Sequence, residues 1–270
     1  MVLSRRFLRF LCAAALAAVF SLGLAGTALA VSTKYWIGAS GGDWKEGANW
    51  APNGVPRDAD EVWISGAEVK ITEAANAESV KLGQGATLSI ESTGKLTIAG
   101  GALHAWGDAT VEVKLNDGLE FTNDTHIAVN PDKTLTLKGS SGRIKGAGAM
   151  TLSGGGTLDL NFPLTTATGL EIKDGSTLNV VDTLPQLTGT VKVTKGNLTL
   201  GYDLPAAAKK VEVTEGVLTV AEGVKIGNGD DTAPDGEVDL KDKGHLVLSG
   251  DLTLKELTTA EGSKITANGK

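Results

Sequence analysis

The chain has little sulfur, and it has few arginines beyond an apolar N-terminal segment. Its one cysteine, Cys12, lies in that segment, so a chain cleaved after Ala30 would have no disulfide and would depend on packing for stability. Cleavage there also removes three of the five arginines and leaves 22 basic against 32 acidic residues, a net charge of about −10. This balance disfavours nucleic acid and anionic membrane surfaces as partners.

Residues 1–30 have the layout of a secretory signal peptide. Arginines at positions 5, 6 and 9 precede an almost wholly apolar run from Leu11 to Leu24, and Ala28-Leu29-Ala30 is a small-x-small cleavage site. The apolar run is shorter than the roughly 20 residues of a membrane-spanning helix, and no charged stop-transfer segment follows it. We therefore predict a signal peptide and an exported mature chain without a transmembrane segment.

A convincing helical period is also missing, and short alternating runs take its place from Val62 onward. Residues 94–100, Gly-Lys-Leu-Thr-Ile-Ala-Gly, show the pattern: Leu96 and Ile98 point one way, and the polar residues between them point the other way. Similar phrases begin at positions 156, 196, 216 and 244. The 36 glycines lie between such runs, where they are typical of turns. The sequence predicts an all-β protein.

Equivalent apolar positions recur at intervals of about 20 residues. One such register is Val69, Leu88, Val111, Leu135, Leu158, Leu178, Leu198, Leu218, Leu246 and Ile265, and a second is Leu170, Val191 and Val211. Three short strands at about 3.3 Å per residue, joined by three tight turns, would close a triangular coil of this length. We predict a single-stranded right-handed parallel β-helix over residues 66–270. An antiparallel sandwich would use the Asp-Gly pairs as hairpin turns but does not explain the repeat, and a propeller needs a period of about 40–45 residues.

The ends of a solenoid expose interior side chains and unpaired backbone, so they need to be covered. Four of the five tryptophans, Trp36, Trp44, Trp50 and Trp63, lie in residues 31–65, which we predict to form an aromatic N-terminal cap. A carbohydrate-stacking platform is the alternative for this cluster. Residues 265–270 are typical of the middle of a coil, so we expect a continuation of the β-helix or a partner at that end.

The tryptophan-rich stretch resembles the N-terminal motif of autotransporter passenger domains and related bacterial surface adhesins. The shared frame is W-x-G, G-x-W, N-W, G-x-P and D-x-V-x-I, carried here by Trp36/Gly38, Gly42/Trp44, Asn49-Trp50, Gly54/Pro56 and Asp60/Val62/Ile64. The resemblance implies a secreted or cell-surface protein of a Gram-negative bacterium, or a periplasmic one if no export system follows. Such families normally end in a membrane β-barrel with aromatic girdles. After Trp106 the only aromatic residues are Phe121, Phe162 and Tyr202, so the resemblance extends to a passenger-like portion alone.

An acidic insertion at residues 227–237 lengthens one repeat to 28 residues. Asp230, Asp231, Asp235 and Glu237 are hard oxygen ligands, and the neighbouring glycines permit sharp turns, so they are candidates for weak Ca²⁺ binding. The EF-hand spacing is not met, and the sequence favours an exposed acidic loop without metal over calcium binding. We expect no other cofactor.

No catalytic residues are identified in the sequence. His104, His126 and His245 are scattered without neighbouring ligands, and Ser140, Ser141 and Ser153 lack both a nucleophile elbow and a nearby histidine. Asp159, Asn179 and Thr199, one coil apart, form an outward ladder with a single carboxylate.

We predict a non-catalytic adhesive or structural surface protein, whose partners are host or matrix surface molecules or glycans. A β-helix polysaccharide lyase or hydrolase is one alternative, since that architecture also hosts such enzymes. A glycan-binding module that uses Trp106 is the other.

Overall fold

The computed structural model describes residues 32–139, 143–146, 148–161, 163–165, 168–182, 184, 187–227 and 235–268. The predicted signal peptide lies outside these residues, as do Ser140, Ser141, Asp230 and Asp231. All described residues belong to one compact unit that begins at Ser32.

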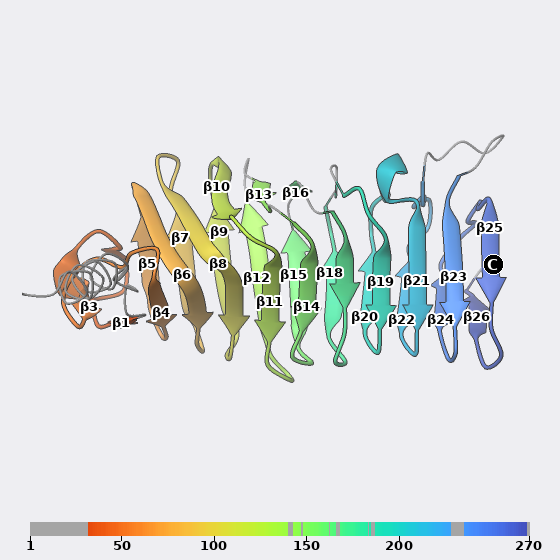
Figure 1. Ribbon diagram of the computed structural model, residues 1–270, viewed down its shortest axis with the longest axis horizontal. Helices are drawn as coiled ribbons and strands as arrows, with labels where there is room; N and C mark the ends of the chain where they lie inside the picture. Colours follow the sequence, from red (N-terminus) through yellow and green to blue (C-terminus); the bar gives the residue numbers. More distant parts are fainter. Residues whose placement is uncertain are drawn as a thin grey trace, which may run out of the picture. The chain divides into compact units, whose positions relative to one another are not determined.

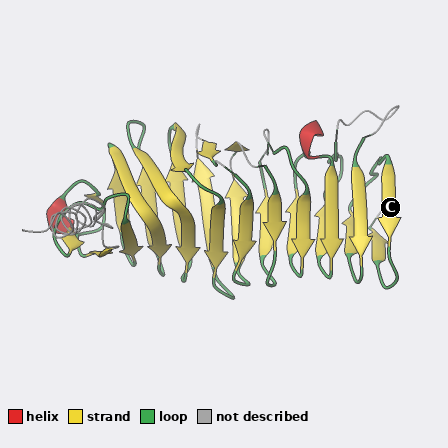
Figure 2. Cartoon of the chain, viewed as in Figure 1, coloured by secondary structure: helices red, strands yellow, loops and turns green. Residues whose placement is uncertain are grey.

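The described chain is built almost entirely of strands, which form two sheets (Figures 1 and 2). Sheet A contains β1 (Ser32–Trp36), β3 (Trp50–Ala51), β4 (Asp60–Ile64), β6 (Ala74–Leu82), β8 (Lys95–Ala105), β10 (Asn116–Phe121), β11 (Thr125–Val129), β13 (Arg143–Lys145), β14 (Met150–Ser153), β16 (Leu164–Thr165), β17 (Leu170–Ile172), β19 (Val191–Thr194), β21 (Lys210–Thr214), β23 (Glu237–Lys241) and β25 (Glu256–Thr259). Sheet B contains β2 (Gly42–Asp43), β5 (Glu68–Ile71), β7 (Ala86–Ile90), β9 (Ala109–Val113), β12 (Thr134–Gly139), β15 (Thr157–Asn161), β18 (Thr177–Val180), β20 (Asn197–Leu200), β22 (Val217–Val220), β24 (His245–Leu248) and β26 (Lys264–Ala267). The only helical pieces described are two short 3-10 turns, η1 (Gly47–Asn49) and η2 (Ala206–Ala208).

Each coil runs along one strand of sheet A, turns sharply, runs along one strand of sheet B and returns by a longer connection. Every strand then pairs in parallel with its equivalent in the next coil, and only β1 with β3 is antiparallel. In Figure 1 the coils follow one another in the order of the chain. The result is a β-solenoid of about 9 turns, which confirms the predicted parallel fold.

The sharp turns between the sheets hold residues in the left-handed region of backbone conformation. Lys195 and Glu215 occupy equivalent two-residue turns, and both have a φ of 54°. Their side chains also approach each other, with Lys195 Nζ 3.5 Å from Glu215 Oε2. A non-glycine residue is strained at such a φ. The conformation of these turns is therefore maintained by the pairing of the flanking strands and not by the backbone preference of Lys195 or Glu215.

The coils have two continuous sides, and a third side carries strands in only part of the solenoid. There the first halves of β6 and β8 pair with each other, and β10, β13 and β16 extend this strip. Most coils therefore hold two strands and a few hold three, because most return connections are irregular loops.

Residues 94–100 lie on this third side, and not on the sheet that holds the similar phrases. Leu96 and Ile98 in β8 pair with Ala75 and Ala77 of β6, whereas the phrases at 156, 196, 216 and 244 begin strands of sheet B. Gly94 is required here, because a Cβ atom at this position would lie 1.8 Å from the carbonyl oxygen of Ile71. Period-2 alternation looks the same on every side of a coil, so the sequence does not distinguish them.

The predicted apolar register is correct at every step but one. Leu158, Leu178 and Leu198 are aligned partners, as are Leu170, Val191 and Val211. Val111, however, pairs with Leu137, and Leu135 pairs with Ala109, so the register assigned there was displaced by two residues. The displacement arises because the coil that contains β10 is longer than its neighbours.

Leucine, valine and isoleucine side chains fill the interior in stacks, one from each coil. Leu178, Leu198 and Leu218 form one such stack and are fully buried. Coil pairing begins earlier than residue 66, since β1 pairs with β4 and β2 pairs with β5 in parallel. The N-terminal segment therefore supplies strands to both sheets in addition to its aromatic side chains.

Candidate functional site

Three of the four N-terminal tryptophans pack together. Trp44 and Trp50 are fully buried, with ring centroids 4.9 Å apart, and Trp36 meets Trp50 edge-on at 5.0 Å. The Trp50 indole N–H donates to the carbonyl oxygen of Trp44 at 2.8 Å. Among the described residues, the indole N–H groups of Trp36 and Trp44 have no hydrogen-bond partner. The cluster lies at the N-terminal end of the two sheets, where β1 to β3 begin them.

Trp63 does not belong to this buried cluster, although we assigned it to the cap. Strand β4 alternates strictly, so Val62 and Ile64 point inward and Trp63 points outward on sheet A. Its neighbours there are Tyr35 of β1 and Trp106, which follows β8. The alternation of Val62, Trp63 and Ile64 already indicates that Trp63 points outward. We assigned Trp63 to the cap because it lies close in sequence to the other tryptophans.

Tyr35, Trp63 and Trp106 form an aromatic row on the outer face of sheet A. The ring centroids of Tyr35 and Trp63 are 6.0 Å apart, with planes tilted by 41°, and those of Trp63 and Trp106 are 6.2 Å apart, tilted by 52°. Tyr35 is 49% exposed and Trp106 39% exposed, whereas Trp63 between them is half-buried. Large rings exposed in contact with one another are uncommon on an otherwise polar surface, so this row is the principal candidate for a binding site.

Polar groups hold the central ring of the row in place. The Trp63 indole N–H donates to Glu61 Oε1 at 2.5 Å, and Lys81 Nζ lies 2.8 Å from Glu61 Oε2 and 4.5 Å from the Trp63 ring centroid. Partial burial raises the pKa of Glu61, but the hydrogen bonds from Lys81 and Trp63 outweigh this effect and hold its pKa below the usual value. The carboxylate therefore stays ionised and the Lys81 charge is neutralised locally.

A glycine makes room for the Trp106 ring. A Cβ atom at Gly83 would lie 2.5 Å from Trp106 Cζ2 and 2.5 Å from Ser65 Oγ. The indole thus lies directly over the turn that ends β6, which is what brings it back towards Trp63. The sequence predicted Trp106 as a glycan contact in a loop, but not the two aromatic partners that the fold places beside it.

Two histidines continue the outer face of sheet A beyond the row. His104 Nε2 lies 2.9 Å from Asn130 Oδ1, and His126 Nε2 lies 2.8 Å from Ser153 Oγ. The expectation that Ser153 has no nearby histidine was therefore wrong, because the two residues are 27 positions apart in sequence but only one coil apart in space. A serine–histidine pair is part of a nucleophilic site, which also requires a group that orients the histidine. No such contact to His126 is found in the described residues.

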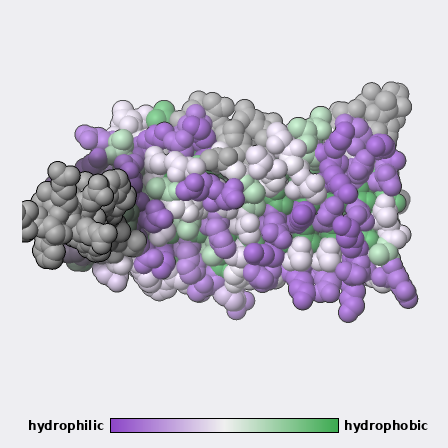
Figure 3. Space-filling model, viewed as in Figure 1, coloured by the Kyte–Doolittle hydropathy of each residue, from purple (hydrophilic) through white to green (hydrophobic). Residues whose placement is uncertain are grey.

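Sheet B presents a polar ladder instead of aromatic rings. Asp159, Asn179 and Thr199 are aligned partners as predicted, and Asn179 Nδ2 donates to Asp159 Oδ1 at 2.7 Å. The same outward column contains Thr87, Thr110, Thr136, Thr219 and Thr266. Figure 3 draws the opposite side, with the sheet A strands in front, and shows hydrophilic and intermediate residues with scattered hydrophobic ones.

A carboxylate bridges two lysines on the third side. Glu120 of β10 contacts Lys95 of β8 at 2.5 Å and Lys145 of β13 at 2.6 Å, and its side chain is 16% exposed. The hydrogen bonds from Lys145 and Lys95 outweigh the effect of burial, so the pKa of Glu120 lies below its usual value. Glu120 and the two lysines link three successive coils. They resemble a structural ion-pair network and not a catalytic acid or base.

The acidic insertion is only partly described. Asp235 Oδ2 lies 4.0 Å from Lys209 Nζ, and Glu237 Oε1 lies 2.8 Å from Lys255 Nζ. The hydrogen bond from Lys255 lowers the pKa of Glu237. Asp230 and Asp231 lie outside the described residues, and the described residues contain no group of three or more metal-ligating side chains. Calcium binding by the insertion stays a hypothesis.

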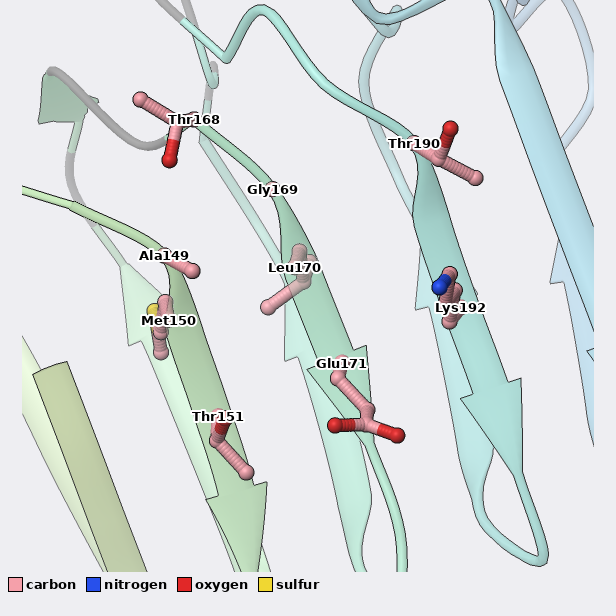
Figure 4. Close-up of a pocket in the computed structure, with 9 residues that line it drawn as sticks. All are labelled: Ala149, Met150, Thr151, Thr168, Gly169, Leu170, Glu171, Thr190 and Lys192. Atoms are coloured by element: carbon pink, nitrogen blue, oxygen red, sulfur yellow. The ribbon is translucent and has the colours of Figure 1, made fainter. Parts of the chain in front are cut away.

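A shallow depression of about 280 Å³ lies at one end of strands β14, β17 and β19. Figure 4 shows Glu171 and Lys192 on neighbouring strands beside it, with Thr168 and Thr190 on the loops that precede those strands. Met150 and Leu170 supply apolar atoms to its floor and are almost fully buried. It contains one carboxylate, so it does not offer the pair of carboxylates that a glycosidase uses.

The last described coil leaves inward-pointing residues uncovered. Leu257 of β25 is aligned with the buried Val238, and Ile265 of β26 is aligned with the buried Leu246. Leu257 and Ile265 are 43% and 45% exposed. Both belong to stacks that are fully buried in earlier coils.

A family model described as a domain of unknown function, DUF8693, matches residues 35–133. This region includes the tryptophan cluster, the whole aromatic row and the first coils of the solenoid. No curated protein and no solved structure matches the chain. Among the described residues, no helix is long and apolar enough to cross a membrane.

Proposed function

We propose that this protein is a non-catalytic, secreted or cell-surface β-solenoid with an adhesive or structural role. The observation that carries this proposal is the outward ladder of sheet B, where short hydroxyl, amide and carboxylate side chains stay in register from coil to coil. Neighbouring strands are about 4.8 Å apart. The ladder is therefore a long, regularly spaced polar surface, which suits distributed contact with an extended partner better than the binding of one small molecule.

Export is supported by the predicted signal peptide, and the resemblance to passenger domains supports a surface location. Host or matrix surface molecules, or glycans, are the expected partners. The exposure of Leu257 and Ile265 supports the further expectation that other strands pack on β25 and β26. These strands belong either to a continuation of the β-helix or to a partner.

Distributed adhesion is tested by retention of protein-coated beads on matrix proteins and on bacterial cells. Replacing Thr110, Thr136 and Thr199 by lysine, one at a time and together, should reduce retention stepwise, because each change disrupts one rung of the same ladder. Thr194→Lys on the outer face of sheet A is the matched control. If retention is absent, or is abolished by one rung alone, extended adhesion by sheet B is refuted.

The alternative is a polysaccharide lyase or hydrolase, and the pairing of His126 with Ser153 and the depression beside Glu171 are the features that favour it. An enzyme would release new reducing ends from pectin or a related glycan. We expect none from a broad polysaccharide panel. Release that is lost in Glu171→Gln would replace the adhesive proposal with the enzymatic one.

A further inference from the structure

We propose that the aromatic row, Tyr35, Trp63 and Trp106, binds a neutral glycan chain that runs along the solenoid axis across successive coils. The three rings come from β1, β4 and the turn after β8, so the row crosses the strands instead of following one of them. A ligand that contacts all three side chains must therefore extend across the strands, as a linear chain of several sugar units does. The proposal concerns one ligand site and does not depend on the adhesive role of sheet B.

The exposure of the rings favours stacking by a ligand. Tyr35 and Trp106 are the more exposed rings, and the half-buried Trp63 lies between them, held by Glu61 and covered on one face by Lys81. The tilts of 41° and 52° between neighbouring rings mean that the row is twisted rather than flat. A glycan whose successive sugars rotate about their linkages can match this twist, and the apolar C–H face of each sugar can pack on a ring.

The polar surroundings favour sugar over other ligands that stack. The Lys81 ammonium is paired with the Glu61 carboxylate, so the site is close to neutral and offers no phosphate-binding group. The formal net charge of −7 also opposes a polyanion. Beside Trp106, the side chains of His104 and Asn130 are paired with each other at half-buried positions, where they can exchange hydrogen bonds with hydroxyl groups.

Gly83 gives a way to test the geometry without removing a ring. A Cβ atom there would collide with Trp106 Cζ2, so a larger side chain must displace the indole from its place over the turn. The backbone φ of Gly83 is outside the left-handed region, so any residue can adopt it, although Ser65, whose Oγ would lie 2.5 Å from the added Cβ atom, must shift together with the indole. Gly83→Leu should therefore weaken binding although all three aromatic residues remain.

The experiment is isothermal titration calorimetry of the purified protein with cellohexaose, chitohexaose, xylohexaose, mannohexaose and laminarihexaose. We expect at least one hexasaccharide to bind, and its monosaccharide to bind far more weakly. Tyr35→Ala and Trp106→Ala should each weaken the affinity for that hexasaccharide by about tenfold, the loss of one aromatic contact. Tyr202→Ala removes a tyrosine that is 47% exposed elsewhere on the solenoid and should leave the affinity unchanged.

Circular dichroism spectra and melting temperatures establish that each variant is folded. The proposal is overturned if no hexasaccharide binds. It is equally overturned if Tyr35→Ala, Trp106→Ala and Gly83→Leu bind as well as Tyr202→Ala does. Capture of a protein by the row in the absence of glycan binding would assign the row to a protein partner instead.

Discussion

Replacing Trp50 by alanine should release the N-terminal end of the solenoid while leaving the later coils intact. Trp50 is the central ring of the buried cluster, in contact with Trp36 on one side and Trp44 on the other. Truncation removes both ring contacts and also the hydrogen bond from the indole N–H to the carbonyl oxygen of Trp44.

The magnitude follows from these contacts. Truncation of a buried tryptophan to alanine costs about 3–5 kcal/mol. Each edge-on ring pair is worth about 0.5–1.5 kcal/mol beyond the area that it buries, and one neutral hydrogen bond about 1 kcal/mol. Because these contributions overlap, we expect a loss near the upper end of the truncation range, about 4–5 kcal/mol.

Hydrogen exchange followed by mass spectrometry is the suitable assay, because it reports each coil separately. Solenoid stability is approximately a sum of coil and interface contributions, so the loss should be confined to coils near the substitution. Peptides that cover β1 to β5 should exchange about a thousandfold faster, since 1.4 kcal/mol corresponds to a factor of ten. Peptides that cover β18 to β24 should exchange as in the unsubstituted protein.

Trp63→Ala is the matched control, because the same atoms are removed from a half-buried position on the outer face. It should cost roughly 1 kcal/mol, with exchange near β1 to β5 changed by no more than about tenfold. Equal effects of Trp50→Ala and Trp63→Ala would contradict a stabilising role of the buried cluster. Uniform acceleration of exchange through all coils in Trp50→Ala would contradict the expectation that the loss is confined to nearby coils.

The remaining predictions concern the stack, the turns, the ion pairs and the insertion. Leu198→Ala should destabilise its coil by about 2–5 kcal/mol in denaturant unfolding, whereas the outward Thr199→Ala should stay within about 0.5 kcal/mol, and equal costs would contradict the assigned faces. Gly94→Ala should cost about 1–3 kcal/mol, since the added methyl meets a carbonyl oxygen, and a neutral result would argue against that close approach. The pKa of Glu120 is lowered in the folded protein, so its ion pairs stabilise the fold above the ordinary value of 4.5, and this stabilisation is lost as the pH falls further. In Glu120→Gln the free energy of unfolding should therefore depend less steeply on pH below about 4.5. An unchanged pH dependence would exclude a contribution from Glu120. Calcium titration of the insertion should give no heat, and a chelator should leave the melting temperature unchanged; saturable heat with a reversible rise in melting temperature would instead assign weak calcium binding to the insertion, whose described members are Asp235 and Glu237.

The repeat length made much of the fold predictable. Steps of 20 residues aligned Leu158, Leu178 and Leu198 correctly, because equal spacing leaves only one way to stack their coils. The step from Val111 to Leu135 was predicted wrongly, because an inserted strand lengthens that coil and two alternating positions fit the pattern equally well. Alternation also placed residues 94–100 on a strand but gave no information about which side of the coil that strand occupies.

The candidate sites were less accessible to prediction, because they depend on contacts between coils. His126 and Ser153 meet across one coil, and nothing in their local sequence indicates this pairing. Trp106 is the only tryptophan outside the N-terminal stretch, which distinguishes it in the sequence, whereas nothing in the local sequence of Tyr35 indicates a contact with Trp63. Only the parallel alignment of β1 with β4 places its ring beside Trp63.

An all-β chain with a solenoid repeat and an aromatic N-terminal stretch can be predicted from the sequence alone, because strand alternation and repeat length depend on residues that are close together in the chain. The tertiary structure decided which tryptophans are buried and which face solvent. Trp44 and Trp50 pack against each other in the interior. The alternation of β4 directs Trp63 outward, where it contacts Tyr35 and Trp106. That division depends on how successive coils stack, which brings together side chains that are far apart along the chain.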